Sequence, residues 1–231
     1  MPGPRCCGAG WPRSNIEHVF ESSAVFPVAA PLAAALPRGG LTRGSVVSVL
    51  GQGATSLLFT LLAGSGTGHW AALVGMPGLG LRAAAELGVD LDRVVLIPDP
   101  GSDALQVVSI LIDGVDLIAV ALPPAVRPAP ARQRVLGGRL RQRGAVLLVA
   151  GPWPGADLVL TARWTGWHGL DRGHGRLRDR ELAVQIGGRR AAGPGAVVDL
   201  LLRAERDAVR IAPAVPTAVP AVRPAAVARV S

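Results

Sequence analysis

The stretch that most constrains the fold is a β-branched run that enters a glycine turn and passes at once into an apolar run. It covers residues 45–62 and reads SVVSVLGQGATSLLFTLL. This strand–loop–helix order is typical of a phosphate-binding loop, where backbone N–H groups and a helix N-terminus hold an anion. The candidate nucleotide-binding residues are Gly51, Gln52, Gly53, Ala54, Thr55 and Ser56.

The loop lacks the side chains that carry the chemistry of such a site. A working loop places a lysine on the phosphates and a Ser or Thr on the metal, but Leu57 and Leu58 occupy those positions. No lysine elsewhere can replace it, because the chain contains none. The sequence therefore predicts a relic whose main role is to turn the chain tightly between strand and helix. Weak Mg-ATP binding through the backbone is left open, and no other cofactor or metal is expected.

Composition sets broad limits on the function. The chain has 231 residues, of which 49% are apolar, and this suits one α/β domain with tails. Its net charge of +8 comes from arginine alone and permits an acidic or nucleic-acid partner. We give more weight to a GC-rich coding bias, which explains arginine, alanine, glycine and proline richness without lysine.

Cysteine placement and hydropathy favour a cytoplasmic protein without a membrane span. Cys6 and Cys7 are adjacent and offer neither a disulfide nor a zinc site, so we interpret them as free thiols in a reducing compartment. The first residues contain no apolar signal-peptide core. The most apolar window, 107–126, is interrupted by Asp113, Asp116 and two prolines.

Strand and helix patterns alternate through residue 150. We expect an N-terminal arm over 1–25, a core over 26–202, and a disordered Pro/Ala/Val-rich tail over 203–231. Strands are predicted at 45–50, 70–74, 93–97, 116–122 and 145–150, with helices at 55–63, 81–87, 103–113 and 131–143. Strands at 157–164, 182–186 and 196–202, the first two joined by a Gly/His/Arg turn region, form a C-terminal β-meander. The fold class is α/β, with a mainly parallel sheet and helices on both faces.

Four segments in this order resemble the RecA ATPase core. They read LPRGGLTRGSVVSVLG at 36–51, LGVDLDRV at 87–94, VDLIAVA at 115–121 and LRQRGAVLLV at 140–149. The resemblance extends over roughly 36–202 and implies a RecA-like, P-loop NTPase-type core.

The catalytic positions that this resemblance implies are all changed. Ala121 stands where the metal-linked Asp is expected, and the loop at 74–78 has no carboxylate to activate water. Gly151-Pro152-Trp153 replaces the segment that carries a nucleotide-sensing Gln, and the two DNA-lining loops are reduced to about 123–132 and 153–155. Without charge neutralisation, metal placement and water activation, no ATPase activity is expected.

A degenerate core with tails is similar to the RecA-like accessory protein of the actinobacterial mutagenesis cassette (ImuA-type). That resemblance implies a non-catalytic scaffold in DNA-damage tolerance by error-prone translesion synthesis. The implied partners are an inactive Y-family polymerase homologue (ImuB-type) and a C-family polymerase, with RecA and, indirectly, DNA as further candidates. The implied place of action is the nucleoid.

Other residues qualify as contact candidates. The basic segment 132–143 is either a face that contacts phosphates or a partner, or a solvated helix face. The arginines of this segment are Arg132, Arg134, Arg139, Arg141 and Arg143. Trp164 and Trp167 are either a hot spot for a partner or part of the core. A metal site at His168, Asp171 and His174 is disfavoured against surface histidines in a turn.

Two alternatives to the scaffold remain at this stage. The first is an ATP-binding recombinase-like enzyme with an unorthodox site, in which Arg43 or Arg82 reaches the phosphates in place of lysine. The second is a basic DNA-binding module, whose binding would depend steeply on salt.

Overall fold

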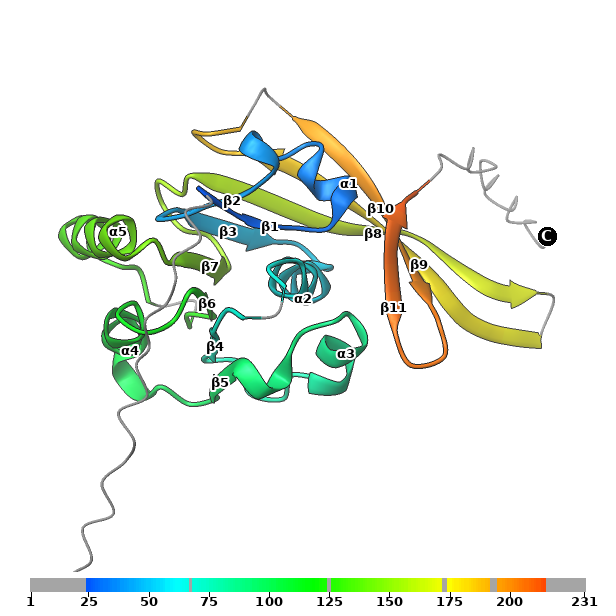
Figure 1. Ribbon diagram of the computed structural model, residues 1–231, viewed down its shortest axis with the longest axis horizontal. Helices are drawn as coiled ribbons and strands as arrows, with labels where there is room; N and C mark the ends of the chain where they lie inside the picture. The colour runs from blue at the N-terminus through cyan, green and yellow to red at the C-terminus, as the bar shows by residue number, and fades with distance from the viewer. Residues whose placement is uncertain (1–23, 67, 124–125, 172–173, 192–194, 215–231) are drawn as a thin grey trace, which may run out of the picture.

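The computed structural model describes residues 24–66, 68–123, 126–171, 174–191 and 195–214 (Figure 1). Its strands are β1 (Val25–Pro27), β2 (Gly40–Thr42), β3 (Val46–Leu50), β4 (Ala71–Val74), β5 (Val94–Ile97), β6 (Leu117–Val120), β7 (Val146–Ala150), β8 (Leu158–Asp171), β9 (His174–Gly187), β10 (Ala196–Ala204) and β11 (Val209–Pro213). Its helices are α1 (Ala30–Ala33), α2 (Ala54–Gly64), α3 (Leu81–Glu86), α4 (Ala104–Leu111) and α5 (Pro130–Arg143).

Within the described residues, one large sheet has the strand order β11–β10–β9–β8–β3–β7–β6–β4–β5. The strands from β8 to β5 pair in parallel, whereas β8, β9, β10 and β11 pair as antiparallel neighbours. Strand β3 lies between β7 and β8, so the strand that leads into the glycine loop is flanked on both sides. The expected α/β class with a mixed, mostly parallel sheet is confirmed.

Helices cover both faces of the parallel strands. Alternate residues along each strand point to opposite faces, and their packing follows that rule: in β4, Leu73 packs in the cluster that contains α2, while Val74 packs in the cluster that contains α4 and α5. Helices α1 and α3 also belong to the first cluster. Both faces of the sheet are therefore buried, which explains the continuous apolar runs of the central strands.

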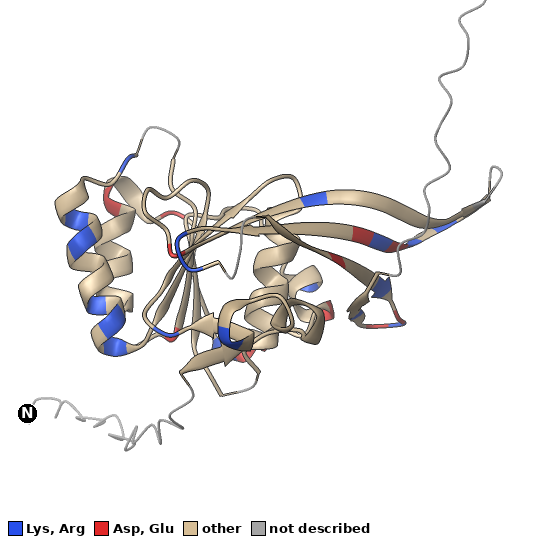
Figure 2. Ribbon diagram, turned by 90° about the horizontal axis from the view of Figure 1, so that it is seen from above, with Lys and Arg blue, Asp and Glu red and all other residues tan. Residues whose placement is uncertain are grey.

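The β8–β9 hairpin is much longer than the meander that the sequence predicts. Residues 165–181, expected as a turn region, are largely strand, because they pair in register from Trp164↔Leu182 to Asp171↔His174. Strand β3 pairs with β8 over Leu158–Thr161 only, so the hairpin continues past the central sheet (Figures 1 and 2). We call residues 163–171 and 174–181 the β-arm.

The C-terminal boundary of the core also differs from the prediction. Strand β10 runs to Ala204, and β11 at Val209–Pro213 pairs with it, so part of the predicted tail belongs to the sheet. Pairing with β10 places Val209–Pro213 in the sheet, although the prediction assigned this segment to the tail. Residues 215–231 of the predicted tail, like residues 1–23 with Cys6 and Cys7, lie outside the described residues.

Candidate functional site

The glycine loop leaves the carboxyl end of β3 and enters α2 within three residues. Gly51 has a φ of +92°, a left-handed conformation that side chains disfavour. The Ala54 N–H donates to the Gly51 carbonyl at 3.2 Å, and the Leu57 N–H donates to the Gly53 carbonyl at 3.0 Å. The strand, tight turn and helix therefore follow each other as the sequence predicts, and they bring Gln52, Thr55 and Ser56 to the same turn.

Strands β8 and β9 close this loop from one side. The Gly53 N–H donates to the Ala162 carbonyl at 3.3 Å. A methyl group on Gly53 would lie 2.2 Å from Cδ1 of Leu182, and one on Gly51 would lie 2.1 Å from the Ala162 carbonyl oxygen. Leu182 is fully buried. The two glycines are thus required by the close approach of this chain's own strands, which supports interpreting the loop as a structural turn.

The neighbouring strand ends carry small residues packed on one another. A methyl group on Gly75, which follows β4, would lie 2.5 Å from the carbonyl oxygen of Ala121, which follows β6. The buried Ser48 hydroxyl of β3 donates to the Gly151 carbonyl at 2.6 Å. Among the described residues, no group of three His, Cys, Asp or Glu side chains is placed to hold a metal ion. This edge of the sheet is held together by backbone packing rather than by ionisable side chains.

Arg43 does not lie near the glycine loop. It precedes β3, whereas the loop follows it, and a five-residue strand separates the two by about 16 Å. Its guanidinium carbon lies 3.9 Å from the Phe26 ring centroid, and its Nη1 lies 3.9 Å from Oδ1 of Asp116. The alternative in which Arg43 replaces the missing lysine therefore gains no support, because the side chain lies at the amino edge of the parallel sheet.

Arg82, the other candidate for that role, interacts within its own helix. Its Nε donates to Oε1 of Glu86 at 2.9 Å, one turn along α3, and its side chain is 83% exposed. No contact of Arg82 with the glycine loop is present among the described residues. The structure therefore gives the Arg-for-Lys alternative no support.

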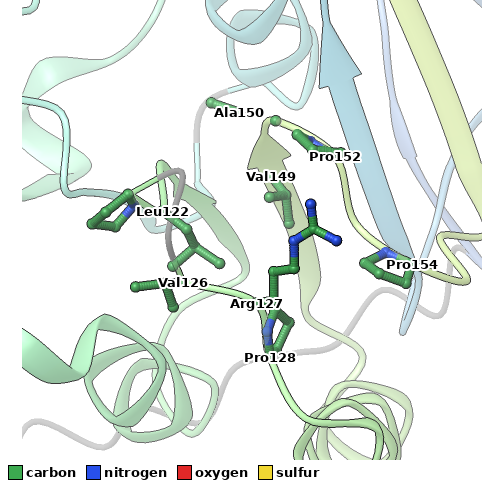
Figure 3. A pocket seen from close by; sticks show the side chains of 10 residues that line it. Leu122, Val126, Arg127, Pro128, Val149, Ala150, Pro152 and Pro154 are labelled. Carbon is green, nitrogen blue, oxygen red and sulfur yellow. The ribbon is translucent and has the colours of Figure 1, made fainter.

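A pocket of about 220 Å³ opens at the carboxyl ends of β6 and β7 (Figure 3). Arg127 is its charged lining residue, and its side chain extends toward the β7–β8 connection. The apolar lining includes Leu122, Pro123, Val126, Pro128, Val149, Pro152 and Pro154. In the sequence these prolines simply end two strands. They converge because β6 and β7 are parallel neighbours, which the sequence pattern does not reveal.

Most of the basic segment is neutralised by a neighbouring helix. Arg132 Nη2 lies 2.7 Å from Asp103, while Arg139 Nη2 and Arg143 Nε lie 2.7 and 3.2 Å from Asp113. Both aspartates flank α4, which packs beside α5 on the same face of the sheet. Arg134 donates a long hydrogen bond to the Pro130 carbonyl, at 3.4 Å, and pairs with no carboxylate among the described residues. The arginine stripe of α5 (Figure 2) is therefore largely an inter-helix ion-pair layer.

Trp164 and Trp167 lie together on the β-arm rather than in the central core. Their ring centroids are 5.3 Å apart, and the guanidinium carbon of Arg180 lies 5.4 Å from the Trp164 ring. Trp164 packs partly against the main core, whereas Trp167 is 52% exposed. His168 lies on the same strand, with its Nε2 2.8 Å from Oε1 of Glu181.

One buried carboxylate fixes the β7–β8 connection to the sheet. Asp157 accepts the Val46 N–H at 3.0 Å, and its other oxygen lies 3.3 Å from Arg189 and 3.2 Å from Arg190. The chain's sequence pattern gives no signal for this link, since Asp157 and Val46 are far apart along the chain. It anchors the base of the β8–β9 hairpin to β3.

The architecture and the closed loop define an α/β protein with a mostly parallel sheet and a glycine turn at the carboxyl end of its first parallel strand. The chain belongs to the MT3502 N-terminal domain family, whose family model matches residues 34–155. That match ends before β8, so the β-arm lies outside it. No helix among the described residues is long and apolar enough to cross a membrane.

A relative from Mycobacterium tuberculosis (strain ATCC 25618 / H37Rv), described as uncharacterized protein Rv3395c, is 45% identical over 118 residues. The alignment covers 50% of this chain and 57% of the relative. This chain therefore matches just over half of the relative's length.

Proposed function

We propose that the protein is a non-catalytic scaffold with a degenerate RecA-like core that supports error-prone translesion synthesis in DNA-damage tolerance. The observation that carries the proposal is the closed glycine loop. The Gly53 N–H, which a phosphate-binding loop would direct at an anion, donates to Ala162, and Leu182 packs against the same residue. A loop occupied in this way connects β3 to α2 and packs the turn against β8 and β9 of the same sheet.

The residues around the loop support the same interpretation. A triphosphate and its metal require positive charge and oxygen ligands at the carboxyl ends of the strands. The adjacent positions are Gly75, Ala121 and Gly151, and the chain has no lysine. We therefore propose that the protein acts through contacts with other macromolecules. In this proposal the partners are a Y-family polymerase homologue and a C-family polymerase, with RecA as a further candidate.

Three contact surfaces are proposed, two of them on the periphery of the sheet. Helix α5 is one, because its arginines are on the surface and their ion pairs with α4 are exposed. The edge of β8 beyond Ala162, which pairs with no strand among the described residues, is another, since a strand edge offers backbone groups to a partner. The segment 213–231 is the third, on its Pro/Ala/Val composition alone.

Equilibrium binding of Mg-ATP, with hydrolysis followed alongside, tests the loss of nucleotide chemistry. We expect neither saturable binding at millimolar nucleotide nor hydrolysis above a protein-free blank. Gly53→Ala serves as a matched variant, because a change in the loop would alter any nucleotide affinity that exists. Saturable binding that Gly53→Ala weakens would refute the relic interpretation and favour an ATP-binding protein.

Complex formation with the polymerase homologue tests the scaffold role. Deletion of 213–231 and a triple change of Arg139, Arg141 and Arg143 to Gln are each expected to weaken co-purification. The control is Arg82→Gln, which removes an exposed arginine from α3. If both variants and the wild-type chain bind equally, neither surface is the contact, and if the wild-type chain fails to bind either polymerase, the scaffold role is refuted.

A further inference from the structure

The register of the β-arm gathers basic and aromatic side chains on one face. Trp164 lies directly opposite Leu182, and Trp167 directly opposite Arg180, so each pair shares a face of the hairpin. Arg176 and Arg178 precede Arg180 at alternate positions of β9, which assigns them to its face by strand periodicity, and both lie at the register irregularity opposite Gly169. We call this set the basic–aromatic face; its members are Trp164, Trp167, Arg176, Arg178 and Arg180.

Acidic side chains of the β-arm lie on the opposite face and have partners there. Glu181 contacts His168 at 2.8 Å, and Asp179 contacts Arg203 of β10 at 3.5 Å. A methyl group on Gly166 would meet Glu181 at 2.8 Å, which places Gly166 on that face too. The bulge between Trp164 and Gly166 lets Trp164 and Trp167, three residues apart, lie opposite Leu182 and Arg180 on one face.

The basic–aromatic face is accessible and its charge is not neutralised. Arg176 and Arg178 are exposed, and no ion pair to either is present among the described residues. Trp167 is 52% exposed beside the Arg180–Trp164 contact. By contrast, the arginines of α5 at 132, 139 and 143 are paired with Asp103 or Asp113. Among the described residues, Arg176 and Arg178 therefore place positive charge without an ion-pair partner on the hairpin that carries the two tryptophans.

A two-stranded ribbon that exposes a large aromatic ring is marginally stable by itself in water, so this surface is suited to a partner. Arginines at alternate positions along β9 recur about 6.8 Å apart and present a line of positive charge. Aromatic rings beside such a line provide stacking surfaces for bases, the combination by which proteins bind single-stranded nucleic acid without sequence preference.

We propose that the basic–aromatic face of the β-arm binds single-stranded nucleic acid, with phosphates on Arg176 and Arg178 and a base stacked on Trp167. Arg180 holds the Trp164 ring beside Trp167 and extends the stacking surface. The inference goes beyond the proposed scaffold role, since it holds whether or not a polymerase binds. It also differs from a general basic module, because binding is confined to one face of one hairpin.

The test is fluorescence anisotropy of a labelled oligothymidylate of about 20 nucleotides, long enough to exceed common single-strand site sizes, with the full chain. Trp167→Ala is expected to weaken binding about 10-fold through loss of one stacked base, and Trp167→Phe to restore most of it. The double change Arg176→Gln and Arg178→Gln is expected to weaken binding about 25-fold at about 0.1 M salt and to reduce the salt slope by about 1.4.

Matched controls separate this face from net charge and from arm folding. Arg134→Gln with Arg143→Gln removes the same charge from α5, and Leu177→Ala changes an exposed side chain on the opposite face of β9. Both are expected to bind as the wild-type chain does. Thermal melts of all variants check that the fold is intact.

Several results would overturn the inference. These are the absence of binding at low salt, equal or tighter binding of the corresponding duplex, or equal losses in the α5 control and the arginine variant of the arm. Loss of polymerase co-purification in the arm variants, with oligonucleotide binding unchanged, would assign the face to a protein partner instead. Because the readout is direct oligonucleotide binding, failure here leaves the proposed scaffold role unaffected.

Discussion

Replacing Gly53 with alanine, alone and together with a shortened Leu182, tests whether the glycine loop is a packing joint. The new methyl group would lie 2.2 Å from Cδ1 of Leu182 and 3.2 Å from Cβ of Ala162. Leu182 is fully buried, so it can yield only by disturbing its neighbours in the core. Gly53 has a φ of −92°, which alanine adopts readily, so the effect comes from packing rather than backbone strain.

The magnitudes follow from these contacts. Overpacking by one methyl group destabilises a core by about 1–3 kcal/mol, and Leu182→Ala removes buried atoms at a cost of about 2–5 kcal/mol. In the double variant the new methyl group occupies space that Leu182 has vacated, and the contact at 2.2 Å no longer exists. The two changes are therefore expected to be coupled, with the double variant more stable than additivity predicts by about 1 kcal/mol or more.

The measurement is urea unfolding of the four proteins, followed by circular dichroism. Leu182→Val is a milder partner if Leu182→Ala does not fold. Gly80→Ala is the matched control, since Gly80 is likewise the N-cap of a helix but has no atom within 4 Å of the added methyl group. Additive losses, within about 0.5 kcal/mol, would refute the claim that β9 closes the loop.

Two further predictions concern single anchors of the fold. Asp157→Ala is expected to lower the free energy of unfolding by about 1–3 kcal/mol, because the buried Val46 N–H loses its acceptor. Urea unfolding measures this change. Asp157→Asn is expected to retain most of the stability, and Glu205→Ala, at an exposed position, to leave it unchanged. Asp103→Ala removes the side chain that accepts the Gln106 N–H at the start of α4, and a loss of about 1 kcal/mol is expected. Thermal unfolding measures it against Ser102→Ala, and an equal melting temperature for the two variants would contradict the cap assignment.

Local patterns predicted the central elements well. The continuous apolar runs of β6 and β7 are what a strand buried on both faces requires, and the helix predicted at 103–113 corresponds to α4 at Ala104–Leu111. The absence of lysine from the glycine loop was also readable, since it depends on residue identity at a fixed offset from a strand and a turn.

The C-terminal half was predicted less well, for a physical reason. A long hairpin depends on cross-strand pairs rather than on local propensity, and residues 165–181 contain glycine, histidine and arginine that suggest a turn. Strand β11 was assigned to the tail because only its partner β10 orders it. The same holds for Arg43, which was a candidate for the phosphate site until the fold placed it beside Phe26 and Asp116.

The sequence by itself determined the class of the fold, the glycine turn after the first parallel strand and the absence of a phosphate-binding lysine, because each depends on residue type and local spacing. Only the tertiary structure decided that Ala162 and Leu182 fill the space beside Gly53, that α4 neutralises the arginines of α5, and that Trp164, Trp167, Arg176, Arg178 and Arg180 share one face. These facts depend on strand register and on helices brought together by crossovers, and a register is fixed by pairing between distant segments.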